Sequence, residues 1–342
     1  MRRSQVTIDL GALRRNAARL AEAAAPAELW AVVKADGYGH GALDAARAAL
    51  AGGARALCVA TAAEGAALRA AFAEARILVL GPLAPGENEV ARASRLEVAI
   101  STAEVPPGVP VHVKVDTGMG RFGLSAPQAE SLPREQVVGV MSHLATADEE
   151  DTAFARAQIE RFAEVADAFP GALRHLANSA ATLRLPEARF DAVRCGIALY
   201  GLSPFGRDPA EDRLEPVLSW RSYVAVAKSL AAGESAGYGR RFVAERPTRI
   251  GIVPVGYADG FRRGLTGTEV LVAGTRRRVV GTVSMDSFAV ALGDEEAGAA
   301  VTLIGDGLLA EEHARVLGTI NYELVTGIGM SPTRAGRRLV GG

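Results

Sequence analysis

Short apolar runs alternate with longer alanine-rich stretches through the first two thirds of this 342-residue chain, and this alternation constrains its fold most strongly. The apolar runs have the length of buried strands, and the stretches between them have helical spacing. Strands that alternate with helices need crossover connections and form a parallel sheet. The expected strands are Leu29–Val33, Ala56–Ala60, Ile77–Leu80, Glu97–Ile100, Pro110–Val115, Val137–Ser142, Leu173–Ala177 and Phe190–Ile197.

Eight such units within about 200 residues predict a closed (β/α)8 barrel of the TIM type, near the lower end of its size range. An open doubly wound sheet is the alternative, but no Gly-x-Gly-x-x-Gly turn follows the first expected strand. The expected helices between the strands include Leu10–Ala23, Ala42–Ala51, Ala62–Glu74 and Thr152–Ala168.

The pattern changes after Pro216, where alternating apolar segments are separated by Gly-rich turns. We therefore expect a barrel domain at residues 1–214 and a mainly-β domain at residues 215–342, with the first few residues able to pack against the second domain. A single helix, Leu309–Leu317, is expected there. The expected strands are Val217–Ala227, Arg249–Val255, Glu269–Ala273, Arg278–Val283, Phe288–Leu292 and Ala300–Ile304.

Composition excludes several classes of protein. The chain is 49% hydrophobic and 23% charged with a net charge of -1, so no basic surface argues for nucleic acid or an anionic membrane. Its start lacks the apolar core of a signal peptide, and no later run is apolar enough to span a membrane, so we expect a cytoplasmic protein. Cys58 and Cys195 give neither a disulfide framework nor metal-ligand spacing, and no metal is expected.

Lysine is rare in this chain, and the position of one lysine points to covalent chemistry. Lys and Arg together number 38, but only Lys34, Lys114 and Lys228 are lysines. Arg serves where only positive charge is needed, whereas Lys can also lose its proton near neutral pH. A neutral ε-amine can form a Schiff base with an aldehyde, the usual way a protein holds pyridoxal 5'-phosphate. Because Lys34 directly follows the first expected strand, we expect it to be the attachment point.

Polar residues gather at the ends of the expected strands, where a (β/α)8 barrel places its active site. They come from different strands, as a site assembled by the barrel requires. Loops are polar in any fold, so this pattern supports the barrel only modestly. The residues are Lys34, Asp36, Tyr38, Asp116, Arg121, His143, Asn178, Ser179, Arg194 and Gly196.

A series of motifs resembles the alanine racemases of the pyridoxal-phosphate barrel type over essentially the whole chain. Their number, order and spacing carry the resemblance, since no single motif is decisive. They are Val33-Lys-Ala-Asp-Gly-Tyr-Gly-His-Gly41, Lys114-Val-Asp-Thr-Gly-Met-Gly-Arg-Phe-Gly123, Ser142-His-Leu-Ala-Thr-Ala-Asp148, Asn178-Ser-Ala180, Gly196-Ile-Ala-Leu-Tyr-Gly201, Gly237-Tyr-Gly239, Val255-Gly-Tyr-Ala-Asp-Gly260, Met285-Asp286 and Ile320-Asn-Tyr-Glu323.

The resemblance implies a two-base reaction on pyridoxal phosphate that interconverts L- and D-alanine, which supplies D-alanine for peptidoglycan. Lys34 is one base, and Tyr238, from the other subunit of a homodimer with shared active sites, is the second base on the opposite face of Cα. A phenol titrates near pH 10, so Tyr238 needs positive charge nearby. By resemblance His143 and Arg194 lie close enough to provide it.

The resemblance also implies how the cofactor and the amino-acid substrate are held. Arg194 faces the pyridine nitrogen and, since Arg only donates, leaves it unprotonated, which weakens the electron sink and limits side reactions. Arg121 donates to the substrate carboxylate and the cofactor's phenolic oxygen; Lys114 orients it, and His175 supports Arg194. The phosphate is held by Tyr38, Ser179 and the amides of Gly196 and Ile197, and the other cofactor-binding residues are His143 and Asn178. Tyr257 and Met285 close over the substrate, with Asp286 as a supporting residue.

The chain departs from the family pattern at some positions. Ser284 stands where the family often has Cys, and Cys195 where it often has Pro. The usual Arg-Val-Pro-Arg run becomes Arg334-Ala-Gly-Arg337. Thr333 stands where many relatives have a phosphate-binding tyrosine, and its hydroxyl reaches less far.

Three other functions stay open at this point. A racemase of broader specificity, acting on serine, lysine or arginine, would share these motifs. A non-catalytic pyridoxal-phosphate carrier would lack the second domain and Tyr238. A decarboxylase on the related two-domain plan would carry a catalytic cysteine in the second domain, but both cysteines here precede it.

Overall fold

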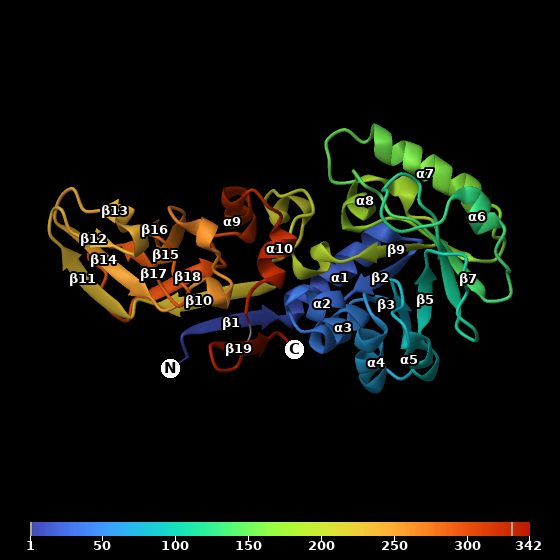
Figure 1. Ribbon diagram of the computed structural model, residues 1–342, viewed down its shortest axis with the longest axis horizontal. Coiled ribbons are helices and arrows are strands. Elements are labelled where there is room, and N and C mark those ends of the chain that lie inside the picture. The colour runs from blue at the N-terminus through green and yellow to red at the C-terminus, as the bar shows by residue number, and fades with distance from the viewer. Residues whose placement is uncertain (1, 330) are drawn as a thin grey trace. The chain divides into compact units, whose positions relative to one another are not determined.

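The computed structural model describes residues 2–329 and 331–342, and the chain divides into two units (Figure 1). One unit comprises residues 12–205 and 209–215. The other comprises the described part of residues 2–11, 206–208 and 216–342. The N-terminal segment therefore belongs to the same unit as the C-terminal part of the chain.

The first unit is built on a closed barrel of eight parallel strands, as the sequence predicts. The first strand, β2, pairs with β3 on one side and with the last strand, β9, on the other, which closes the barrel. The strands are β2 (Glu28–Val32), β3 (Ala56–Val59), β4 (Arg76–Val79), β5 (Glu97–Ile100), β6 (Val111–Lys114), β7 (Val137–Met141), β8 (Leu173–His175) and β9 (Ala192–Cys195).

Helices follow most of these strands and lie outside the barrel (Figure 1). Strands such as β3, β6 and β9 are buried along their whole length, because one face packs on helices and the other fills the interior. The helices are α1 (Leu10–Ala24), α3 (Ala42–Ala51), α4 (Ala62–Ala71), α5 (Glu87–Ala93), α6 (Ala126–Glu130), α7 (Ala153–Ala166) and α8 (Ser179–Arg184).

The turn after β2 has an unusual backbone. In α2 (Lys34–Tyr38), Ala35, Asp36, Gly37 and Tyr38 all have φ between 49° and 62°, which makes one left-handed turn. A left-handed conformation costs roughly 1–2 kcal/mol at each residue other than glycine. The turn is held by backbone bonds and by the Asp36 carboxylate, which accepts from the amide of Ala42 at 2.8 Å.

The second unit is a mainly-β domain around a nine-stranded sheet of order β11-β14-β17-β16-β15-β18-β10-β1-β19. A two-stranded sheet pairs β12 (Ser235–Ala236) with β13 (Phe242–Val243). The large sheet contains β1 (Ser4–Asp9), β10 (Leu218–Tyr223), β11 (Val226–Leu230), β14 (Thr248–Val253), β15 (Glu269–Val272), β16 (Thr275–Val280), β17 (Phe288–Ala291), β18 (Ala300–Ile304) and β19 (Ala335–Val340).

This domain differs from the sequence expectation in its helices and strands, and β1, β12, β13 and β19 were not among the expected strands. The expectation of a single helix is wrong, because α10 (Asn321–Thr326) follows α9 (Ala310–Leu317); at six residues α10 is too short for a periodic apolar pattern. The expected strand Val217–Ala227 is two strands, β10 and β11, which pair with different neighbours.

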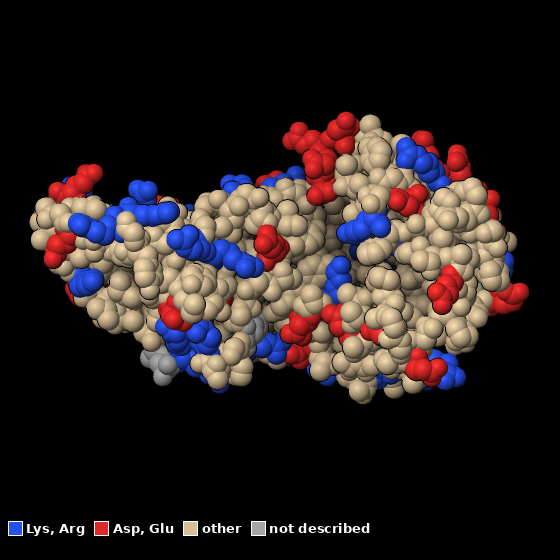
Figure 2. Space-filling model, viewed as in Figure 1, with Lys and Arg blue, Asp and Glu red and all other residues tan. Residues whose placement is uncertain are grey.

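The surface agrees with the near-neutral charge of the chain. Figure 2 shows Lys and Arg side chains interspersed with Asp and Glu on the face in view, without an extended basic patch among the described residues there. No helix within residues 2–329 and 331–342 is long and apolar enough to cross a membrane.

Candidate active site

Lys34 lies two residues after the end of β2, at the carboxyl end of the barrel strands, as the sequence predicts. Its side chain is partly buried. Burial, followed by the positive charge of Arg121, lowers the pKa of Lys34 below its ordinary value. A larger fraction of its amine is therefore neutral near pH 7 than for a surface lysine, which is the form that attacks a carbonyl.

Glu64 holds the backbone beside Lys34, and sequence reasoning missed it. Its Oε1 accepts a hydrogen bond from the amide of Ala35 at 2.8 Å, while its Oε2 accepts from the amide of Ala60 at 2.7 Å. Thr61 and Glu64 also form the capping box that begins α4. The pattern Thr61-x-x-Glu64 was visible in the sequence, but it shows only the cap and not the bond to a neighbouring loop.

Positive charge is concentrated around Lys34. Burial and the charge of Arg194 lower the pKa of Lys114 to about 8, with further contributions from Arg121 and Lys34. Burial and the same cations lower the pKa of His143 to about 3, so this imidazole is neutral at physiological pH. A group of cations that depress one another's pKa values forms a strong site for an anion.

Arg194 is buried in β9 and is held by a dense set of acceptors. Its Nη1 donates to Nδ1 and to the backbone oxygen of His175, at 2.8 and 2.7 Å. Its Nη2 donates to the backbone oxygens of Ser142 and Leu176, at 2.7 and 3.1 Å, and lies 3.4 Å from Nδ1 of His143. None of the bonds among the described residues engages Nε.

Small donors meet where α8 begins and β9 ends. The Ser179 hydroxyl accepts from the amides of Gly196 and Ala198, at 3.0 and 3.4 Å. A Cβ on Gly196 would lie 2.3 Å from the hydroxyl of Tyr38, so only glycine lets these groups approach. Asn178 caps α8 by accepting from the amide of Ala181 at 3.0 Å.

The structure thus brings the barrel candidates together at one end of the barrel. Lys34 and Tyr38 come from the loop after β2, Lys114 ends β6, and Arg121 follows in the next loop. His143 follows β7, His175 ends β8, and Asn178 and Ser179 begin α8. Arg194, Gly196 and Ile197 come from β9 and the turn after it.

The candidates of the β domain also lie together, along residues 281–285. The hydroxyl of Thr282 donates to the backbone oxygen of Tyr238 at 3.0 Å. The amide of Tyr257 donates to the backbone oxygen of Ser284 at 3.0 Å, and that of Ala258 to Met285 at 3.0 Å. All three side chains are exposed on the surface of this domain: 75% for Tyr238, 41% for Tyr257 and 53% for Met285.

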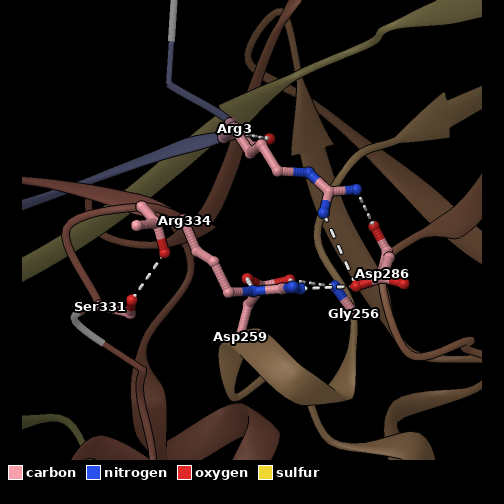
Figure 3. Close-up of polar contacts among 8 residues, drawn as sticks. Arg3, Gly256, Asp259, Asp286, Ser331 and Arg334 are labelled. Carbon is pink, nitrogen blue, oxygen red and sulfur yellow. Dashed lines mark hydrogen bonds and ion pairs between the residues drawn. The ribbon is translucent and has the colours of Figure 1, made fainter.

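Arg334 fixes the two loops that carry Tyr257 and Met285 (Figure 3). Its guanidinium binds both carboxylate oxygens of Asp259, at 2.6 and 2.9 Å, and Oδ1 of Asp286 at 2.8 Å. The Asp259 carboxylate also accepts from the amide of Gly256, and Arg3 lies 3.6 Å from Asp286. This is the place of the atypical Arg334-Ala-Gly-Arg337 run; Thr333, where a phosphate-binding tyrosine is usual, bonds to Ser331 at 2.9 Å.

Comparison with known families identifies the class and then the family. A model described as "Alanine racemase, N-terminal domain" matches residues 8–204, and one described as "Alanine racemase, C-terminal domain" matches residues 217–335. With the barrel, the β domain and the lysine site, these matches define the class: the protein is a racemase, an isomerase. More narrowly, the chain belongs to the alanine racemase family.

Individual relatives agree over their full length. The chain is 41% identical to the alanine racemase of Symbiobacterium thermophilum, covering 96% of this chain and 95% of the relative. The solved structure of the alanine racemase of Streptomyces coelicolor superposes with a TM-score of 0.91 at 39% identity, over 99% of this chain and 98% of the other. That of Bartonella henselae, with covalently bound pyridoxal phosphate, has a TM-score of 0.91 at 29% identity, over 98% and 99%.

Proposed function

We propose that this protein interconverts L- and D-alanine with pyridoxal 5'-phosphate bound to Lys34, and so supplies D-alanine for peptidoglycan. The observation that carries the proposal is the position of Lys34, partly buried at the carboxyl end of the barrel, where burial and the charge of Arg121 lower its pKa. A partly neutral lysine within a group of cations suits a cofactor that offers an aldehyde and a phosphate.

The residues present fit this cofactor. Within the described part of the chain no bond engages Nε of Arg194, and this donor suits a ring nitrogen. The hydroxyls of Ser179 and Tyr38 are donors suited to a phosphate, and Gly196 beside them has no side chain that would block it. The cations near Lys34, which include Arg121 and Arg194, favour a negatively charged cofactor in this site.

When bound at Lys34, pyridoxal phosphate would supply an electron-withdrawing ring that acidifies the Cα proton of the amino acid. Arg121 binds the substrate carboxylate and orients Cα. Lys34, once displaced from the cofactor, holds or accepts a proton at its Nζ on one face of Cα. Arg194 donates through Nε and keeps that ring nitrogen unprotonated, which limits side reactions.

Inversion at Cα requires a second acid–base group on the opposite face, and we assign Tyr238 from the second subunit of a homodimer. Two features of the β domain support this. Tyr238 is 75% exposed, although large aromatic side chains are usually buried. Its backbone is nevertheless fixed, because the hydroxyl of Thr282 bonds to the Tyr238 carbonyl and Gly237 has the positive φ of 78° that this turn needs.

The first test is chiral chromatography of a mixture of L-amino acids after incubation with the protein and pyridoxal phosphate. D-alanine alone supports the proposal, and several D-amino acids would point to broader specificity. A cofactor-loaded protein that forms no D product would refute it. For the two-base assignment, Tyr238→Phe should lower racemisation in both directions by at least about 100-fold, since general acid–base groups contribute about 10²–10⁴. Tyr223→Phe, on β10, is the matched control.

A further inference from the structure

A chain of four side chains inside the barrel connects Arg194 to a carboxylate. Beyond the bond from Arg194 to Nδ1 of His175, Nε2 of His175 lies 2.8 Å from Nδ1 of His112. Nε2 of His112 lies 2.8 Å from Oε2 of Glu97, and Oε1 of Glu97 accepts from Nε of Arg76 at 3.1 Å. We call Glu97, His112, His175 and Arg194 the relay. It starts on β5 and passes through β6 and β8 to β9.

The geometry permits only one arrangement of protons in the relay. Arg194 can only donate, so Nδ1 of His175 must be an acceptor, and the single proton of that neutral ring lies on Nε2. This proton faces Nδ1 of His112, which must therefore accept, and the proton of His112 lies on Nε2. That proton points at the Glu97 carboxylate. Every bond consequently runs in one direction, from the guanidinium cation to the carboxylate anion.

The charge states agree with this arrangement. Burial, followed by the charge of Arg194, lowers the pKa of His175 well below its ordinary value, and burial lowers the pKa of His112 although Glu97 opposes it. For Glu97, burial would raise the pKa, but the bonds from His112 and Arg76 outweigh it and lower the pKa. Both imidazoles are thus neutral and Glu97 is ionised at neutral pH.

The two histidines of the relay are buried and closely packed by neighbouring residues of the barrel. His112 and His175 are fully buried, and the Trp30 ring on β2 packs against both, with centroids 5.8 and 4.6 Å away. Since β2 lies across the barrel from β6, these rings point into the barrel interior. On β7, a Cβ at Gly139 would lie 2.0 Å from Nδ1 of His112, so only glycine leaves the ring its place.

We propose that Glu97 and His112, acting through His175, are positioning residues for Arg194: they fix both the orientation and the polarity of its guanidinium, and so direct its free Nε toward the bound cofactor. The proposal rests on the proposed function for the identity of the cofactor. The relay itself depends only on contacts within the barrel. Glu97 lies at the start of β5, remote in sequence from every motif that resembles the family.

The first test measures the protonation of the relay histidines and does not depend on catalysis. The chain has five histidines, so ¹⁵N NMR of histidine-labelled protein can resolve each ring. We expect His112 and His175, identified with single His→Gln variants, to carry their proton on Nε2 and to stay neutral between about pH 7 and 8. A proton on Nδ1 of either ring, or an imidazolium in that range, would overturn the proposal.

The second test removes the charge at the end of the relay. Glu97→Gln keeps an acceptor for His112 but no anion, and its matched control is Glu28→Gln, because Glu28 also lies near Arg76, at 4.0 Å, and is outside the relay. We expect Glu97→Gln to shift the absorption band of the bound cofactor and to lower kcat about tenfold, with KM for alanine changed less than about twofold. Glu28→Gln should leave all three unchanged.

The outcomes separate the relay from the proposed function. A folded, cofactor-loaded Glu97→Gln protein with the parent's absorption band and kcat would refute the role of the relay, whereas the racemase proposal would stand. If the parent protein forms no D-alanine, the NMR and absorption readouts still test the relay. Should Glu97→Gln fail to fold, His112→Gln offers a second interruption of the relay with the same expected spectral shift.

Discussion

Replacing Arg334 by alanine tests how the β domain holds the loops that carry Tyr257 and Met285. The Arg334 guanidinium makes two bonds to Asp259, whose side chain is 2% exposed, while that of Arg334 is 28% exposed. Removing one partner of a fully buried pair costs about 3–5 kcal/mol, because the other charge is left unpaired. Since water can reach this site in the variant, and the amide of Gly256 still donates to Asp259, we expect about 2–3 kcal/mol.

The assay is chemical denaturation at fixed protein and cofactor concentration, because both change apparent stability. Arg334→Lys retains a charge but not the paired geometry and should lose about 1–2 kcal/mol. Arg338→Ala, an exposed arginine of the same strand β19, is the control and should change stability by less than about 0.5 kcal/mol. KM for alanine should rise about three- to tenfold in Arg334→Ala, since both loops lose their fixed positions. An Arg334→Ala protein as stable as Arg338→Ala would show that the network contributes nothing.

Three further predictions concern the barrel. Lys34→Ala should abolish covalent attachment of the cofactor; borohydride reduction and peptide mass spectrometry of the parent should find the label on Lys34, and a label on Lys114 or Lys228 would contradict the assignment. Glu64→Ala should lower the free energy of unfolding by about 1–3 kcal/mol and speed cofactor release, with exposed Glu74→Ala as the control. The pKa of His143 falls from 6.5 to about 3 on folding, so as the pH falls the unfolded chain binds a proton at His143 before the folded chain does. The contribution of neutral His143 to the free energy of unfolding is therefore complete above about pH 6.5. Below that pH it is lost by up to about 1.4 kcal/mol per pH unit. His143→Asn apoprotein should therefore lose less stability than the parent between pH 6.5 and 5.

The barrel could be predicted because its signal is repeated and local. Each strand is a short apolar run, each helix an amphipathic stretch, and all eight expected strands are present with ends shifted by at most about three residues. The large sheet of the β domain was less accessible. Its edge strand β19 and its neighbour β1 pair residues more than 300 positions apart, a partnership that no local pattern encodes.

The residues of the candidate site also differ in whether a local sequence pattern identifies them. Lys34, Arg194 and Tyr238 could be chosen because their residue types and motifs carry chemistry. Glu97 and His112 could not, since a Glu and a His that each sit in an apolar strand gain their meaning only when β5 and β6 lie side by side. Arg334 and Asp259, 75 positions apart, are a similar case.

The turn after Lys34 shows why such distant contacts matter for the chemistry. Ala35 has no local reason to adopt φ of 53°, because alanine gains nothing from the left-handed region and pays its steric cost. Besides the backbone bonds and the Asp36 carboxylate, the Glu64 carboxylate, which belongs to the cap of α4, stabilises this conformation by accepting from the Ala35 amide. At Ala35, next to Lys34, the steric preference of alanine for negative φ is therefore overcome by contacts with distant residues. A helix cap in the following β/α unit thus holds the backbone next to Lys34, so we expect substitutions at Thr61, which does not contact the lysine in any described bond, to change the environment of Lys34.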